Sequence, residues 1–162
     1  MAIRLSAEVR YPSFERSCAD IPAGVDEMDK EQVIADLNEL LTLEYTAVLQ
    51  YTYEGFVIAG LDRPRFVAMF QGEANESLMH ARMVGEKIVA LGGIPTTEIG
   101  AIDTTTDLMT MLRNNLALES RAVELYSRAL EHAQDDIALR VMLENQVQIE
   151  KASVEELQRI LA

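Results

Sequence analysis

Apolar residues recur at steps of three and four along four stretches of the chain, the spacing that places side chains on one face of an α-helix. These stretches cover about residues 29–59, 64–91, 107–133 and 136–161. The row of the first stretch is Val33, Leu37, Leu40, Leu41, Val48 and Tyr51. No competing pattern alternates apolar and polar residues as a half-buried strand would. The pattern therefore predicts an all-α protein of four long helices.

The breaks between these helices differ in length. Gly60 and Asp62 mark a short turn after the first helix, and residues 134–136 mark another after the third. Residues 92–106 combine Gly, Pro and Thr, and they are too many for a tight turn between antiparallel helices. Two antiparallel hairpins joined by a long crossover are therefore expected, which is the connectivity of one class of four-helix bundle.

One domain accounts for the 162 residues. Residues 1–28 contain two prolines and a glycine with no sustained period, so an irregular N-terminal arm is expected before a bundle of residues 29–162. No apolar run reaches the ~18 residues that cross a bilayer, and residues 1–11 lack the apolar stretch of a signal peptide. The expectation is a cytoplasmic protein without a membrane partner.

The charge is strongly acidic, with 27 Asp and Glu against 14 Lys and Arg and a net charge of −13. This excess repels a phosphate backbone and weighs against nucleic acid as a partner. Cations are the natural partners of such a chain, provided that some carboxylates point inward. A single cysteine cannot form an internal disulfide.

Two carboxylates stand where the helical rows require apolar residues. Glu44 interrupts the row of the first helix, and Glu119 interrupts the row of the third. An unpaired buried charge costs several kcal/mol or more, so a bound metal cation is the simplest partner. Tyr51 and Tyr126 each follow their Glu by seven residues, and they either hydrogen-bond the ligands or serve as core aromatics.

The second helix carries Glu73, Glu76, Ser77 and His80 within about 100° of one another around its axis. A lone histidine on an apolar face is usually a core residue, but carboxylates on two other helices favour a ligand role for His80. His132, the other histidine, shows no such neighbours. Carboxylates with imidazole and no thiolate suit iron or manganese better than a structural zinc ion.

Three stretches, LNELLTLEYTAVLQY, HARMVGEKIVALGGIP and LALESRAVELY, resemble the corresponding segments of bacterioferritins, and the resemblance spans residues 30–161. It implies a ferritin-like four-helix bundle that handles iron at a dinuclear site. That site takes one Glu from each of two helices and a Glu-x-x-His pair from each of the other two. Glu44, His80 and Glu119 match this pattern, and the resemblance assigns them the catalytic role.

The chain departs from this pattern at two places. Ser77 stands three residues before His80, and on the last helix the best overlay puts Asn145 and Gln148 on the Glu and His positions. The least polar face of that helix is Ala138, Val141, Met142, Ile149, Ala152, Leu157 and Ile160. The expected metal ligands are Glu44, Glu76, His80, Glu119 and Glu144, with Glu73 and Glu150 in reserve.

The leading hypothesis is a protein that holds Fe²⁺ inside the bundle and oxidises it with O₂ or peroxide, for iron storage or detoxification. The alternatives are a dinuclear oxidase of an organic substrate and a non-catalytic shell subunit with a degenerate site.

Haem is not expected, because Leu78 occupies the position of the haem-binding methionine of bacterioferritins. A homo-oligomer is expected, a dimer at minimum, with closure into a cage left open. Its interface is predicted from four apolar residues beyond the core row: Tyr53, Phe56, Val57 and Ile58.

Overall fold

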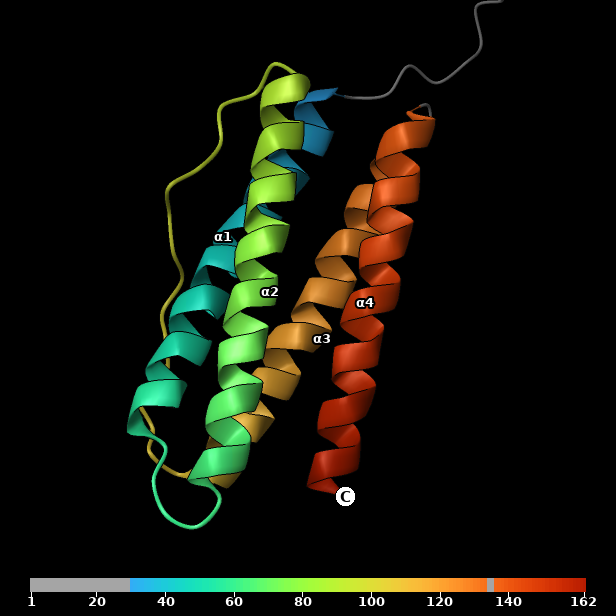
Figure 1. Cartoon of the computed structure of the whole chain (residues 1–162). Coiled ribbons are helices and arrows are strands. Elements are labelled where there is room, and N and C mark those ends of the chain that lie inside the picture. Colours follow the sequence, from blue (N-terminus) through green and yellow to red (C-terminus); the bar gives the residue numbers. More distant parts are fainter. Residues whose placement is uncertain (1–29, 134–135) are drawn as a thin grey trace, which may run out of the picture.

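Four helices make up a computed structural model that describes residues 30–133 and 136–162 (Figure 1). They are α1 (Lys30–Val57), α2 (Arg63–Ala90), α3 (Leu108–His132) and α4 (Ile137–Leu161). α1 and α2 form one antiparallel hairpin, α3 and α4 form the other, and α1 packs against α3. The described ranges contain no strand, and none of their helices is long and apolar enough to cross a membrane. The predicted bundle is confirmed, whereas the expected arm lies outside the described residues.

The helix ends follow from local chemistry. Gly60 adopts a φ of 85° in the turn before α2, a region that only glycine enters without strain. The Arg63 guanidinium donates to the carbonyl of Ile58 and closes this turn. The side chains of Asp107 and Asp136 each accept a hydrogen bond of 2.9 Å from a backbone N–H three residues on. These two N-caps start α3 and α4.

The crossover runs from the end of α2 along the outer side of α1 to the start of α3 (Figure 1). Polar side chains of α1 hold it there. Asn38 Oδ1 accepts from the Thr96 N–H at 2.7 Å, and Thr46 Oγ1 accepts from the Gly100 N–H at 2.7 Å. Gln50 accepts from the Asp103 N–H at 2.7 Å and donates to the Asp103 carbonyl at 3.0 Å. An otherwise irregular segment therefore has most of its support from one helix.

Charged residues also join the two hairpins. Asp36 on α1 is 2% exposed, and it contacts Arg128 Nε at 3.0 Å and His132 Nδ1 at 2.5 Å on α3. Glu39 pairs with both Arg128 and Arg121. A buried carboxylate is tolerated when it is paired in this way. His132, for which the sequence showed no partner, thus has a structural contact far from the other histidine.

A layer of polar side chains divides the hydrophobic core into two clusters. One cluster gathers around Leu37, Val84 and Leu143, and the other around Phe70, Met111 and Leu157. On each helix the break between the clusters coincides with a buried polar residue, listed here from α1 to α4: Glu44, His80, Glu119 and Glu150. The bundle therefore positions one polar group from every helix at the same level.

Candidate metal centre

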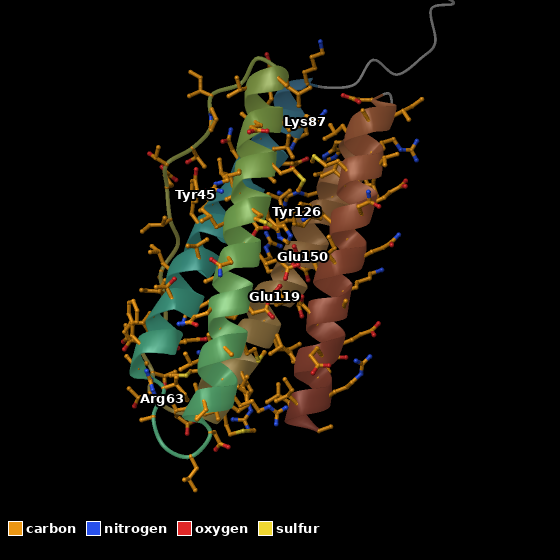
Figure 2. All side chains as sticks on the ribbon, viewed as in Figure 1. Tyr45, Arg63, Lys87, Glu119, Tyr126 and Glu150 are labelled. Atoms are coloured by element: carbon orange, nitrogen blue, oxygen red, sulfur yellow. The ribbon has the colours of Figure 1, made fainter. Side chains whose placement is uncertain are left out.

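Glu44, His80, Glu119 and Glu150 form the centre of the polar layer. Their exposed fractions are 4%, 7%, 5% and 3%. Figure 2 shows Glu119 and Glu150 with Tyr126 midway along the bundle, between the helices. Three buried carboxylates and one imidazole are far more charge and polarity than a core tolerates without a specific partner.

The closest grouping is Glu44, His80 and Glu150, whose ligand atoms all lie within 4.8 Å of one another. Nδ1 of His80 is 3.0 Å from Glu150 Oε1 and 3.6 Å from Glu44 Oε1. Among the described residues Glu150 Oε1 has no hydrogen-bond partner, although it lies 3.0 Å from the imidazole. A buried carboxylate oxygen without a hydrogen-bond donor is suited to a cation.

Two tyrosines form hydrogen bonds between the two hairpins across this centre. The Tyr51 hydroxyl on α1 donates to Glu119 on α3, and the Tyr126 hydroxyl on α3 donates to Glu44 on α1 at 2.7 Å. Each tyrosine is also a buried core aromatic. Both roles considered from the sequence therefore apply to the same side chains, and each carboxylate is oriented by the opposite half.

The pKa values of the centre show how unfavourable its charges are without a cation. Burial raises the pKa of Glu44, and it raises the pKa of Glu119 well above its usual range, with the charge of Glu150 adding to both. Burial lowers the pKa of His80, but the contacts with Glu150 and Glu44 outweigh it and raise that pKa to about 10. In the metal-free protein, protons therefore supply positive charge that a metal ion would otherwise bring.

The remaining candidates from the sequence lie at the margin or outside. Glu76 Oε1 is 3.9 Å from His80 Nε2, the ring nitrogen that faces away from the other carboxylates, and its side chain is 41% exposed. Glu73 is half-buried, and burial followed by the charge of Glu76 raises its pKa. Glu144 does not reach the centre: its side chain is 50% exposed and pairs with Arg140 at 3.7 Å.

The residues of α4 differ most from the sequence expectation. Asn145 and Gln148 are exposed, and Gln146 and Glu150 are the polar residues of α4 that point inward. Gln146 was missed, although it is 4% exposed and interacts with the Tyr126 hydroxyl. The signal that could have found this pair is their four-residue spacing, which continues the row of Leu139 and Leu143.

The donor set fits one divalent ion. Glu44, Glu150 and Nδ1 of His80 converge from three helices, and oxygen with imidazole nitrogen is a donor combination that iron and manganese accept. Three surface hollows in the described part of the chain lie elsewhere, along α1, α2 and the crossover, and these three are not lined by the ligand residues.

Comparisons with known proteins agree with this architecture. The model of the ferritin-like domain family matches residues 34–162. The bacterioferritin of Desulfovibrio desulfuricans is 29% identical over 133 residues, which are 80% of this chain and 74% of that protein. A crystal structure of that bacterioferritin with its diiron site has a TM-score of 0.76 at 26% identity, over 82% of this chain and 79% of its own.

A ferritin-like, diiron-carboxylate protein from Bacillus anthracis has a TM-score of 0.81 and 30% identity, over 84% of this chain and 99% of its own. The family match covers all four helices from the first turns of α1 to the end of α4. The order of the helices and the long crossover are those expected from the sequence. The chain belongs to the ferritin-like family and is similar to the bacterioferritins.

Proposed function

We propose that this protein binds Fe²⁺ inside its bundle and serves iron storage or detoxification. The observation that carries the proposal is the buried group of Glu44, His80 and Glu150, with a carboxylate oxygen that lacks a hydrogen-bond partner. The diiron-carboxylate and bacterioferritin relatives support iron as the ion. Mn²⁺ has similar preferences for oxygen and imidazole ligands and is the alternative ion.

Each residue has a distinct task in this proposal. Glu44 and Glu150 supply negatively charged oxygens, and His80 presents Nδ1 on the same side. The outer nitrogen, Nε2, faces Glu76, and a carboxylate in that position fixes the orientation of a ligating imidazole. Tyr126 orients Glu44 by its hydrogen bond. Glu76 therefore acts as an outer partner of the histidine in our proposal.

Uptake of Fe²⁺ exchanges protons for metal. Ligands bind metal in their deprotonated forms, so His80 and the carboxylates release protons as the ion enters. O₂ or peroxide then accepts the electron that each Fe²⁺ gives up on oxidation to Fe³⁺. The iron is cargo in this scheme, and the protein provides the binding groups and a water-poor environment.

The test is an anaerobic titration with Fe²⁺, followed by metal analysis of wild-type protein and two matched variants. Glu150→Gln removes a buried ligand, and we expect it to weaken binding by at least about tenfold. Glu144→Gln makes the same chemical change on the same helix, at a half-exposed site, and binding should stay at the wild-type level. Equal effects of the two variants, or no binding of Fe²⁺ or Mn²⁺ by the wild type, would overturn the proposal.

A further inference from the structure

The core of this bundle supplies fewer carboxylates than a pair of divalent ions requires. The dinuclear site of ferritin-like proteins combines two single Glu residues with two Glu-x-x-His pairs, which makes four carboxylates and two imidazoles. In this chain Glu44 and Glu119 occupy the two single positions, on α1 and α3. α2 contributes His80, and α4 contributes Glu150 in place of a second imidazole.

The two bridging positions are the ones that have changed. Three residues before His80 stands Ser77, which is buried, and one turn before Glu150 stands Gln146, the other buried polar residue of α4. Steps of three and four residues keep these side chains on the inner face of their helices. Neither a hydroxymethyl group nor a neutral amide can bridge two metal ions as a carboxylate does. Both bridges are therefore missing, one from each hairpin.

We propose that the bundle holds a single divalent ion per chain, bound by Glu44, His80 and Glu150, with Glu119 beside it and held by Tyr51. This proposal rests on the function proposed above. Charge supports it: two divalent ions bring four positive charges against three buried carboxylates, and the two further carboxylates at the margin, Glu73 and Glu76, are partly exposed. Part of the charge of a second ion would therefore be buried without a buried counter-charge, which is costly. A single divalent ion brings two positive charges, which the three buried carboxylates balance.

The geometry points the same way. Glu44, His80 and Glu150 converge within 4.8 Å, and Glu119 is not part of that group. Glu119 instead receives the hydrogen bond of the Tyr51 hydroxyl. Reduction of O₂ to peroxide takes two electrons, and a single Fe²⁺ supplies one. The centre is thus suited to binding and release of individual ions, and coupled oxidation of two Fe²⁺ in one chain is not available to it.

Stoichiometry tests the inference directly. Metal-free wild-type protein and the Glu44→Gln variant are both titrated anaerobically with Fe²⁺. The number of ions bound by the variant is subtracted from the wild-type number, so that ions on the acidic surface are not counted. We expect one ion per chain. Two ions per chain would overturn the single-ion inference and leave the proposed function standing, whereas none would overturn both.

A variant that supplies both bridging carboxylates tests whether their absence limits the site to one ion. Ser77→Glu combined with Gln146→Glu supplies both missing bridges, and it should raise the count from one ion to two per chain. Asn145→Glu adds a carboxylate to the exposed side of α4 and should leave the count at one. A folded double variant that still binds one ion would show that the bridges do not limit the site. If the double variant does not fold, the wild-type count decides alone.

Discussion

His80 contacts two buried carboxylates, Glu44 and Glu150, and these contacts change its pKa. Its pKa in the fold is about 10, against about 6.5 for an unperturbed histidine, because the contacts with Glu150 and Glu44 outweigh burial. The stabilisation from this proton is fully present below about pH 6.5 and is lost as the pH rises toward 10. The raised pKa values of Glu44 and Glu119 act with the same sign, since their contributions diminish as the pH rises above about 4.5.

We therefore expect the metal-free protein to lose stability between pH 6.5 and 9.5. His80 alone contributes a slope of at most about 1.4 kcal/mol per pH unit. Urea unfolding in the presence of a chelator measures it, and His80→Gln should remove this part of the slope. With Mn²⁺ present between pH 6.5 and 8 the trend should reverse, because binding strengthens as the ligands lose protons. Metal-free protein that grows more stable over this range would contradict the assignment.

The two tyrosine hydroxyls offer a second prediction at this scale. Tyr126 donates to Glu44, a proposed ligand, whereas Tyr51 donates to Glu119, which the single-ion proposal leaves unbound. Each Phe substitution removes a donor to a buried carboxylate and should cost about 1–3 kcal/mol of stability. Only Tyr126→Phe should also weaken Fe²⁺ binding, by about tenfold or more. Isothermal titration of both variants checks this, and equal losses of affinity would count against it.

Part of the metal centre could be located from the sequence alone. Glu44 and Glu119 interrupt rows of apolar residues that are otherwise continuous, so their burial could be predicted. Glu150 gave a weaker signal, because the row of Leu139 and Leu143 that leads to it already contains the polar residue Gln146. Where the core itself is polar, hydropathy cannot identify the inward face.

α4 shows the same limit for a whole element. Its ends were predicted within about a residue, but the face that points into the core was not predicted correctly. Ala138, Val141 and Ile149 were expected inside and are exposed. The inward row is Leu139, Leu143, Gln146, Glu150 and Leu157. A helix that places two polar groups in the core has fewer apolar residues on that face, so its least polar side lies partly outside. The row of the first helix was dominated by inward apolar residues. There Val33, Leu37, Leu40, Leu41 and Tyr51 are buried as predicted, and Val48 is half-buried.

Gln50 connects α1 to the crossover. Besides its two bonds to Asp103, its side chain donates to Glu54 at 2.8 Å. Glu54 is 1% exposed and also accepts from Asn115 at 2.7 Å. Burial raises the pKa of Glu54 to about 6, although the two amide donors lower it. Gln50 thus contacts both the crossover and Glu54, the buried carboxylate that joins α3 to α1.

Gln50→Leu should therefore loosen the crossover. A buried carboxylate loses one of its donors, which costs about 1–3 kcal/mol, and the Asp103 amide proton should exchange faster with solvent. Hydrogen exchange and urea unfolding measure the two effects. Tyr53→Phe is the control, because it removes a single exposed bond to the carbonyl of Thr104 and should cost at most about 1 kcal/mol. Unchanged exchange at Asp103 in Gln50→Leu would show that the crossover is held by other contacts.

At the scale of the whole molecule, one hairpin leaves large apolar side chains uncovered. On α1 and α2 the exposed fractions are 40% for Leu49, 75% for Phe56, 62% for Met79 and 60% for Val89. The interface expected from the sequence needs correction. Ile58 is 3% exposed and belongs to the core, Tyr53 and Val57 are half-buried, and Phe56 alone of the four is exposed. The other hairpin also exposes apolar side chains, namely Met109, Ile137, Val141 and Ile149. We favour the group on α1 and α2 as a protein contact surface, because it includes Phe56, which the sequence predicted for the interface.

We expect the protein to form at least a dimer through α1 and α2, because a two-fold contact lets the same apolar residues meet their own copies. Light scattering at micromolar concentration should give a mass of twice 18.1 kDa or more. Phe56→Asp combined with Met79→Asp places charges on this surface and should shift the mass toward the monomer. Ile137→Asp changes a residue that is 77% exposed on the other hairpin, and it should leave the dimer intact. A wild-type mass near 18.1 kDa would exclude the dimer and any larger assembly, and the exposed side chains of α1 and α2 would then require a different partner.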